Sequence, residues 1–121
     1  MLYYDGEYHL FFQSNPFGIK WANMFWGHAV SKDLIHWELS PLNPVLRASD
    51  EDRQIANPRL TEAQRQRIAT ARNINNSDLD FCEYRGRLII NYSWGNQQGV
   101  EHLAEAVYEG TEEQFLLGWF P

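Results

Sequence analysis

Residues 9–37 read HLFFQSNPFGIKWANMFWGHAVSKDLIHW, and this stretch decides the fold. Two aromatic-rich runs flank a polar loop, and a third aromatic run precedes them at residues 2–4. Asp5-Gly6-Glu7 lies between the run at residues 2–4 and the run that begins at Tyr8. It is a turn signal, because glycine adopts positive φ without strain. The Asn15-Pro16 pair and Gly18 mark a loop. The stretch therefore predicts a hairpin over 2–13, a loop over 14–24, a third strand over 25–31 and a fourth over 35–39.

Four short antiparallel strands within about 40 residues are typical of a propeller blade. A weaker copy of the same order follows later in the chain, with a turn over 84–87 and strands over 88–96, 102–108 and 115–121. We therefore expect an all-β fold: a partial β-propeller of about two antiparallel blades with one short linker helix. The predicted domain organisation is a first blade over 1–46, a loop and linker helix over 47–72, and a second blade over 73–121.

The linker helix is predicted over 61–72. Thr61 is a suitable N-cap, and Glu62 and Gln64 fall in the first turn. One face of this helix carries a thin stripe that suits a position on the surface of a sheet. Its residues are Leu60, Gln64, Ile68 and Ala71.

Composition narrows the classes of partner. The formal net charge is −6, which disfavours nucleic acid and anionic membrane surfaces because both attract a basic face. No apolar run is long enough to span a bilayer. A single cysteine, Cys82, predicts no internal disulfide and fits a buried apolar position in a reducing compartment. No secretory signal precedes the first strand, so a cytoplasmic location is expected. Phosphate-loop and zinc signatures are absent, and no cofactor or metal is expected.

Two motifs carry a family resemblance. His9 to Pro16 follows the pattern H-x-F-Y-Q-Y-N-P, and Trp21 to Trp37 follows W-G-N-x-x-W-G-H-A-x-S-x-D-L-x-H-W. Together they resemble the first propeller blade of glycoside hydrolase family 32, the β-fructosidases (invertases, inulinases and levanases). Departures are Ser14, Ala22 and Phe25. Residues 73–121 are also similar, less specifically, to the closing blade of a propeller-type glycosidase.

The resemblance implies a carbohydrate partner, a fructoside, and a set of contact residues. Gln13 and Trp21 match positions that line the family's fructose subsite, and Asn15 and Asn23 belong to the same loop. The chemistry suits a sugar, since amides bond vicinal hydroxyls and an indole stacks on the apolar ring face. Trp94 and Asn96 repeat this aromatic-and-amide combination and are predicted to contact the same ligand.

Packing is the alternative for several of these side chains. Trp21 and Trp26 also suit the rim of a sheet, and Asn15-Pro16 also suits a plain turn. His28, His36 and Trp37 are interpreted as structural.

The catalytic residues are less well supported. A retaining glycosidase needs two carboxylates about 5–5.5 Å apart. The family's nucleophile motif, W-M-N-D-P-N-G, does not occur in these 121 residues. Its Arg-Asp-Pro motif is not found either, and its Glu-Cys acid motif stands reversed as Cys82-Glu83. Asp78, Asp80 and Glu83 are the remaining candidates.

The segment around Asn75, Asn76, Asp78 and Asp80 admits three interpretations. It suits an Asx-rich turn that bonds its own backbone, a pair of catalytic or sugar-binding carboxylates, or a metal-binding loop. The sequence favours the turn.

The expected function is that of a glycoside hydrolase-related protein of the β-fructosidase type, in a truncated form that lacks the nucleophile motif, with fructosides such as sucrose or fructans as substrates. The alternative is a non-catalytic carbohydrate-binding remnant, or a fragment that works only when assembled. The sequence leaves open whether the chain is an enzyme. Two incomplete blades leave open strand edges, which a homo-oligomer would cover.

Overall fold

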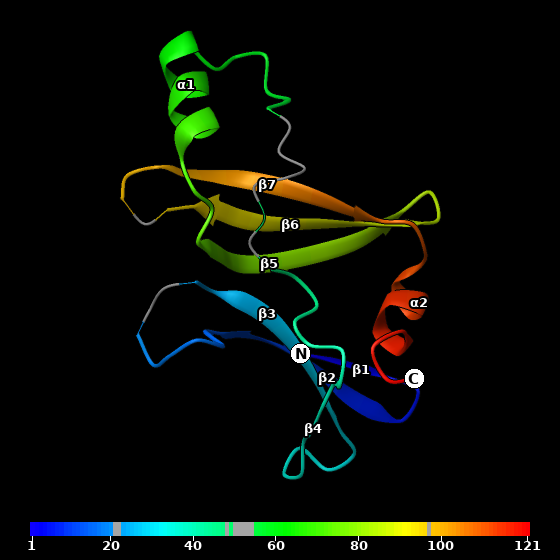
Figure 1. The fold of residues 1–121 in the computed structure, drawn as a ribbon. Coiled ribbons are helices and arrows are strands. Elements are labelled where there is room, and N and C mark those ends of the chain that lie inside the picture. Colours follow the sequence, from blue (N-terminus) through cyan, green and yellow to red (C-terminus); the bar gives the residue numbers. More distant parts are fainter. Residues whose placement is uncertain (21–22, 48, 50–54, 97) are drawn as a thin grey trace.

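The computed structural model describes residues 1–20, 23–47, 49, 55–96 and 98–121. It is mostly β, with a four-stranded and a three-stranded antiparallel sheet and two short helices. The two sheets lie in separate layers, with β5–β7 above β1–β4 in the view of Figure 1. The described residues form no closed propeller. The prediction of antiparallel β structure is confirmed at this level.

The first sheet has the order β1-β2-β3-β4. The hairpin of β1 (Leu2–Tyr4) and β2 (Glu7–Ser14) turns at Asp5 and Gly6, whose φ angles are 48° and 83°. Positive φ at both central residues is the geometry of a type I′ turn, which matches the twist of a hairpin. β3 (Phe25–Ser31) pairs with β2 and places Gln13 opposite Trp26. The predicted hairpin and third strand are therefore confirmed.

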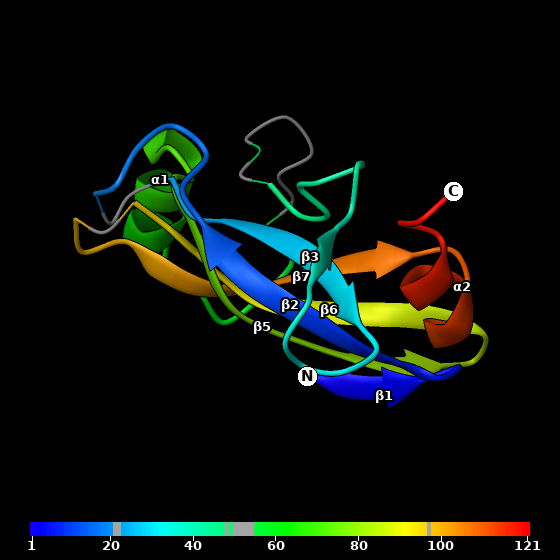
Figure 2. The same cartoon turned by 90° about the horizontal axis from the view of Figure 1, so that it is seen from below.

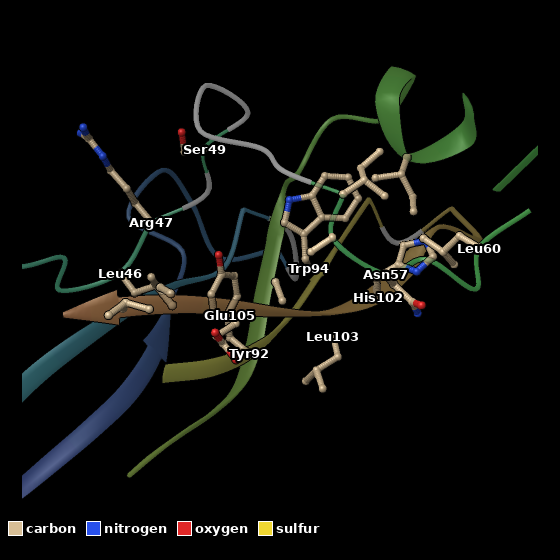
Figure 3. A pocket seen from close by; sticks show the side chains of 16 residues that line it. Leu46, Arg47, Ser49, Asn57, Leu60, Tyr92, Trp94, His102, Leu103 and Glu105 are labelled. Carbon is tan, nitrogen blue, oxygen red and sulfur yellow. The ribbon is translucent and has the colours of Figure 1, made fainter. Parts of the chain in front are cut away.

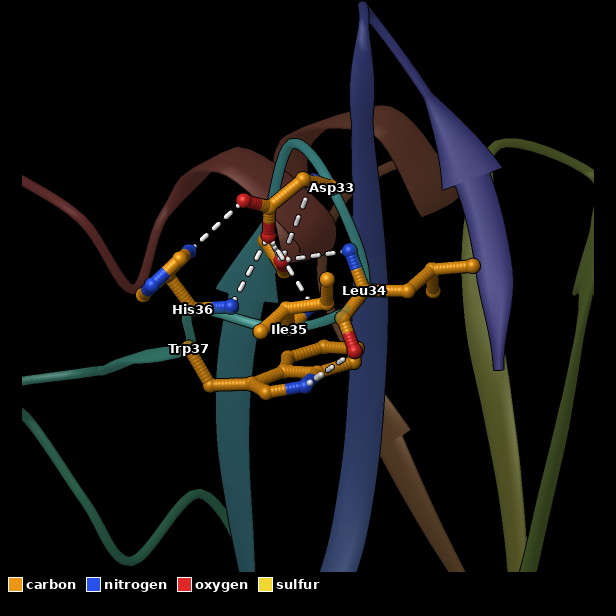
Figure 4. Close-up of polar contacts among 6 residues, drawn as sticks. Asp33, Leu34, Ile35, His36 and Trp37 are labelled. Atoms are coloured by element: carbon orange, nitrogen blue, oxygen red, sulfur yellow. Dashed lines mark hydrogen bonds and ion pairs between the residues drawn. The ribbon is translucent and has the colours of Figure 1, made fainter.

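The fourth strand is shorter than predicted, because β4 covers only Glu38–Leu39. Asp33 holds the residues between itself and β4 in a turn, as Figure 4 shows. Its Oδ1 accepts hydrogen bonds from the backbone N–H groups of Ile35 (2.9 Å) and His36 (2.8 Å). The Trp37 indole N–H donates to the Leu34 carbonyl at 3.2 Å. These bonds use backbone groups that a ladder would need, so pairing begins only at Glu38.

The second sheet has the order β5-β6-β7. β5 (Asn75–Tyr84) and β6 (Arg87–Gly95) turn at Arg85 and Gly86, with φ angles of 53° and 74°, as in the first hairpin. β7 (Glu101–Tyr108) pairs with β6 over its whole length. The repeated hairpin and third strand are confirmed.

A fourth strand over 115–121 was expected, and this prediction is wrong. The segment contains α2 (Glu112–Leu117) instead, so the described residues form two helices rather than one. Thr111 and Gln114 form a capping box: the Thr111 hydroxyl accepts from the Gln114 N–H at 3.2 Å, and the Gln114 side chain accepts from the Thr111 N–H at 2.9 Å. The buried Phe115 and Leu116 then fix the helix against the sheets.

The predicted linker helix is confirmed as α1 (Glu62–Thr70). Like α2, it begins with a capping box, here formed by Thr61 and Gln64. Ile68 and Ala71 are buried against Trp94 and Val100, with Leu60 packed at the margin. Gln64 lies on the predicted stripe but is exposed. A second core cluster, between the sheets and α2, centres on Leu88, Ile90 and Phe115.

In the described part of the chain, backbone pairing joins the two sheets at Met24. The Met24 N–H donates to the Ile74 carbonyl (3.1 Å), and the Asn76 N–H donates to the Met24 carbonyl (3.2 Å). This parallel bridge brings the loop after β2 and the start of β5 to the same end of the molecule. Figure 2 shows the two layers from below.

Two further expectations are wrong. Asn75 to Asp80 belong to strand β5 and not to an Asx-rich turn: Asn75, Asn76, Ser77 and Asp80 pair with β6, and Asp78 lies in a bulge between them. Cys82 is exposed rather than buried. It pairs with Ile89 on the outward face of the second sheet, opposite to the face that carries the core.

Candidate functional site

A small cavity lies where β2 ends. Its volume is about 250 Å³, and its lining combines two amides and a lysine with apolar side chains: Gln13, Ser14, Asn15, Gly18, Ile19, Lys20 and Met24. Two of the predicted contact residues, Gln13 and Asn15, are therefore brought together. Ser14 and Lys20 were not predicted, and only their position beside the amides could have indicated them.

Gln13 and Asn15 differ in what their amides do. The Asn15 Oδ1 accepts from the Phe17 N–H (3.0 Å), and its Nδ2 donates to the Lys20 carbonyl (2.8 Å). Asn15 therefore shapes the loop that walls the cavity. The half-buried Gln13 side chain makes no hydrogen bond to any other described residue. Its donor and acceptor are available to a ligand.

The other predicted residues of this loop are less informative. Trp21 lies outside the described residues. Asn23 is half-buried with φ 51°, a left-handed conformation that asparagine tolerates. Trp26 is buried, at 9% exposure, which fits the packing alternative.

Trp94 and Asn96 do not join this cavity. Trp94 is buried beneath α1 and lines a separate cavity of about 810 Å³ along β7, seen in Figure 3. The Asn96 Oδ1 accepts from the N–H groups of Gln98 (2.8 Å) and Val100 (3.3 Å), so it closes the loop between β6 and β7. The expected convergence of the two loops on one cavity is not observed.

The candidate carboxylates spread along β5. A bulge lies between Ser77 and Asp80, where Asp78 has φ 53°. The Ser77 and Ser93 hydroxyls both donate to Asp78 Oδ2 at 3.0 Å. Glu83 accepts from the Glu112 N–H at 3.2 Å and so binds the first turn of α2.

The length of β5 separates Asp78 from Glu83. Asp78 and Glu83 are five residues apart on one strand, so their Cα atoms lie roughly 16 Å apart at about 3.3 Å per residue. A retaining pair requires about 5–5.5 Å between carboxyl groups. Asp80, between them, accepts from the backbone N–H of Phe81 (3.0 Å) and is exposed. Within the described part of the chain, no three His, Cys, Asp or Glu side chains gather as metal ligands would.

Two histidines form a buried pair that the sequence did not predict. His9 Nδ1 and His28 Nε2 lie 3.0 Å apart, and both residues are almost fully buried. Burial, with a smaller contribution from the neighbouring His9, lowers the pKa of His28 to about 4, and burial also lowers the pKa of His9. Both rings therefore stay neutral at pH 7. The His28 ring also stacks on Phe11, which makes its role structural, as the sequence indicated.

Comparison with known proteins agrees with the motifs in the first sheet. Residues 1–56 match the glycosyl hydrolases family 32 N-terminal domain. This segment carries the whole first sheet and the Gln13 cavity. The family 32 resemblance predicted from residues 9–37 is confirmed for it.

The relatives of the family 32 segment are larger proteins. The extracellular exo-inulinase of Aspergillus awamori is 54% identical over 52 residues, 43% of this chain and 10% of that enzyme. The levanase of Bacillus subtilis is 62% identical over 42 residues, 35% of this chain and 6% of the levanase.

A plant protein shows the same pattern. The vacuolar acid beta-fructofuranosidase 2 of a Rosa hybrid cultivar is 61% identical over 44 residues, which is 36% of this chain and 7% of the plant protein. The family 32 segment thus spans a tenth or less of each of these three relatives. No solved structure matches the chain significantly. No described helix has the length and apolar character needed to cross a membrane.

Proposed function

We propose that this chain binds fructosides at the Gln13 cavity and belongs functionally with the β-fructosidases. The observation that carries the proposal is the Gln13 amide, which lines the cavity and makes no hydrogen bond to another described residue. The relatives are named for inulin, levan and β-fructofuranosides, so the ligand class proposed is a fructose unit of such a compound.

The physical support is the fit between cavity and sugar. A furanose presents vicinal hydroxyls that an amide bonds with both its donor and its acceptor. Lys20 is a cationic donor among the lining residues, and Met24 and Ile19 add apolar lining. We propose that Trp21, next in sequence to Lys20, supplies the ring that stacks on the sugar.

Binding is favoured over hydrolysis by these residues alone. The Asp78 carboxylate is bonded by two serine hydroxyls, Glu83 is bonded to the first turn of α2, and the nucleophile motif W-M-N-D-P-N-G does not occur in the 121 residues. Hydrolysis is the second candidate and is favoured by the family 32 match. It would require assembly with another chain that supplies the missing carboxylate. We also propose that the first sheet represents one blade of a propeller.

The test is a titration of the protein with fructose and with inulin-derived fructo-oligosaccharide. Nuclear magnetic resonance should show shifts of the Gln13 side-chain amide and the Gly18 backbone amide. Gln13→Ala should weaken binding at least tenfold, and Trp21→Ala should abolish quenching of tryptophan fluorescence. Gln98→Ala removes an exposed amide from the other loop and should leave binding unchanged.

A folded protein that shows no shift with millimolar fructo-oligosaccharide would refute the binding proposal. Release of fructose from sucrose, inulin or levan would establish the second candidate instead.

A further inference from the structure

Backbone pairing at Met24 brings one residue of the second sheet next to the Gln13 cavity. Met24, which lines that cavity, pairs in parallel with Asn75 at the start of β5 (Figure 1). Residues paired across neighbouring strands carry their side chains on the same side of a sheet. Asn75 therefore lies on the Met24 side, although it comes from outside the segment 1–56 that matches family 32.

The Asn75 amide has an engaged donor and a free acceptor. Its side chain is buried, at 6% exposure, and its Nδ2 donates to the Ser77 hydroxyl at 3.4 Å. That hydroxyl donates to Asp78 Oδ2 at 3.0 Å, so it is left to accept from Asn75 and sets the direction of the amide. Asn75 Oδ1 has no hydrogen-bond partner in the described part of the chain. A buried acceptor in this state has lost its hydration and gained no bond in return.

A free donor lies on the same side. Trp26 is two residues from Met24 along the chain, so the two side chains share one side of the strand, and Gln13 is paired with Trp26. The Trp26 indole is buried, at 9% exposure, and its N–H has no partner among the described residues. Trp26 and Asn75 are diagonal neighbours across the bridge. Such positions lie about 7–8 Å apart, within reach of an aromatic side chain.

We propose that the sugar site extends past Met24, where Trp26 and Asn75 bind one hydroxyl group of the ligand between them. The inference rests on the proposed function, the binding of a fructoside at the Gln13 cavity. A sugar hydroxyl is an acceptor and a donor at once. It accepts from the Trp26 N–H and donates to Asn75 Oδ1, so a single group satisfies both buried atoms.

Met24 is the side chain that the ligand displaces to reach this pair. It is buried, at 6% exposure, and lines the cavity. A methionine side chain is unbranched and has three rotatable bonds, so it adapts readily. A charged substituent would lose its hydration here, because neither an indole nor an amide supplies a countercharge. The inner part of the site therefore selects a neutral hydroxyl over a carboxylate or a phosphate.

The experiment is a titration with inulin-derived fructo-oligosaccharide, followed by nuclear magnetic resonance. The signals of the Trp26 indole N–H and the Asn75 side-chain amide should shift together with that of Gln13. Trp26→Phe keeps a ring and removes the N–H, and Asn75→Ala removes the acceptor. Each substitution should weaken binding about fivefold, the effect of losing one hydrogen bond.

Asn76→Ala is the matched control. Asn76 is 1% exposed, and neither of its amide atoms has a partner in the described residues. It follows Asn75 on the same strand and so points to the opposite face, where it is paired with Trp94. Its loss should change the affinity less than twofold, and its side-chain signals should not move.

Two results would overturn the inference and leave the proposed function standing. One is binding with a Gln13 shift but no shift at Trp26 and Asn75. The other is unchanged affinity in folded Trp26→Phe and Asn75→Ala variants. An Asn76 shift as large as that of Asn75 would also count against it, because it would report a general rearrangement. A wild-type protein that does not bind refutes the proposed function, and the inference with it.

Discussion

At the scale of single residues, the burial of the His9–His28 pair makes the free energy of unfolding depend on pH. The folded-state pKa of His28 is lowered to about 4, chiefly by burial, and the pKa of His9 is also lowered by burial. An unfolded histidine titrates near 6.5. Between these values the unfolded chain binds more protons than the folded chain, so acid favours unfolding.

We therefore predict that the free energy of unfolding is fully retained above about pH 6.5 and falls by up to about 3 kcal/mol towards pH 4. Urea unfolding at pH 7.5, 6.0, 5.0 and 4.5 measures it. The double variant His9→Phe/His28→Phe should flatten this dependence. His102→Gln, which removes a histidine from β7, should keep it. A wild-type protein with constant stability across this range would contradict the prediction.

Asp33 carries the turn that shortens β4. A hydrogen bond from the His36 ring is the main cause that holds the pKa of this carboxyl well below its usual range, and backbone N–H groups add to it. Asp33→Ala should lower the Tm and speed amide exchange at residues 35 and 36. Asp80→Ala removes an exposed aspartate from β5 and serves as the control. Unchanged exchange at 35 and 36 would show that the turn forms without Asp33.

At the scale of elements, α1 depends on its first turn. The Thr61 hydroxyl accepts from the Gln64 N–H at 3.3 Å, and the Gln64 side chain accepts from the Thr61 N–H at 2.8 Å. Thr61→Ala should cost about 1 kcal/mol. Tryptophan fluorescence during urea unfolding is a suitable readout, because α1 covers Trp94.

Thr70→Ala is the matched control for the cap. Its hydroxyl donates to the Gln66 carbonyl within the same helix at 2.9 Å and caps nothing at the N-terminus. This substitution should leave stability unchanged or raise it slightly, since alanine favours helix. Equal losses in the two variants would argue against the capping box.

At the scale of the whole molecule, one aromatic cluster joins both sheets to α2. Phe115 lies 5.7 Å, ring centre to ring centre, from Phe11 of the first sheet and from Phe81 of the second. Phe115 is 3% exposed. Its loss would leave a cavity that both sheets line.

Phe115→Ala should therefore lower the free energy of unfolding by about 3–5 kcal/mol. Amide exchange should rise in both sheets together. Phe17→Ala removes a ring that is 75% exposed and should change stability by less than about 0.5 kcal/mol. Faster exchange confined to β5–β7 would show that the sheets unfold independently.

The sequence by itself determined the local elements. These are the turns at Gly6 and Gly86, the aromatic strands and the cap of α1 at Thr61. Each depends on a few neighbouring residues, so the sequence predicts it. The family 32 motif likewise placed Gln13 and Asn15 together, because they lie two residues apart at the end of β2.

Only the tertiary structure decided what distant residues do. The Thr111 cap is local, but the packing of Phe115 against both sheets is tertiary, and Cys82 is exposed because of the face that its strand presents. The separation of Trp94 from Gln13, the His9–His28 contact and the position of Asn75 beside Met24 depend on how the two layers meet. Packing between segments far apart in the chain sets these features, and no local pattern encodes it.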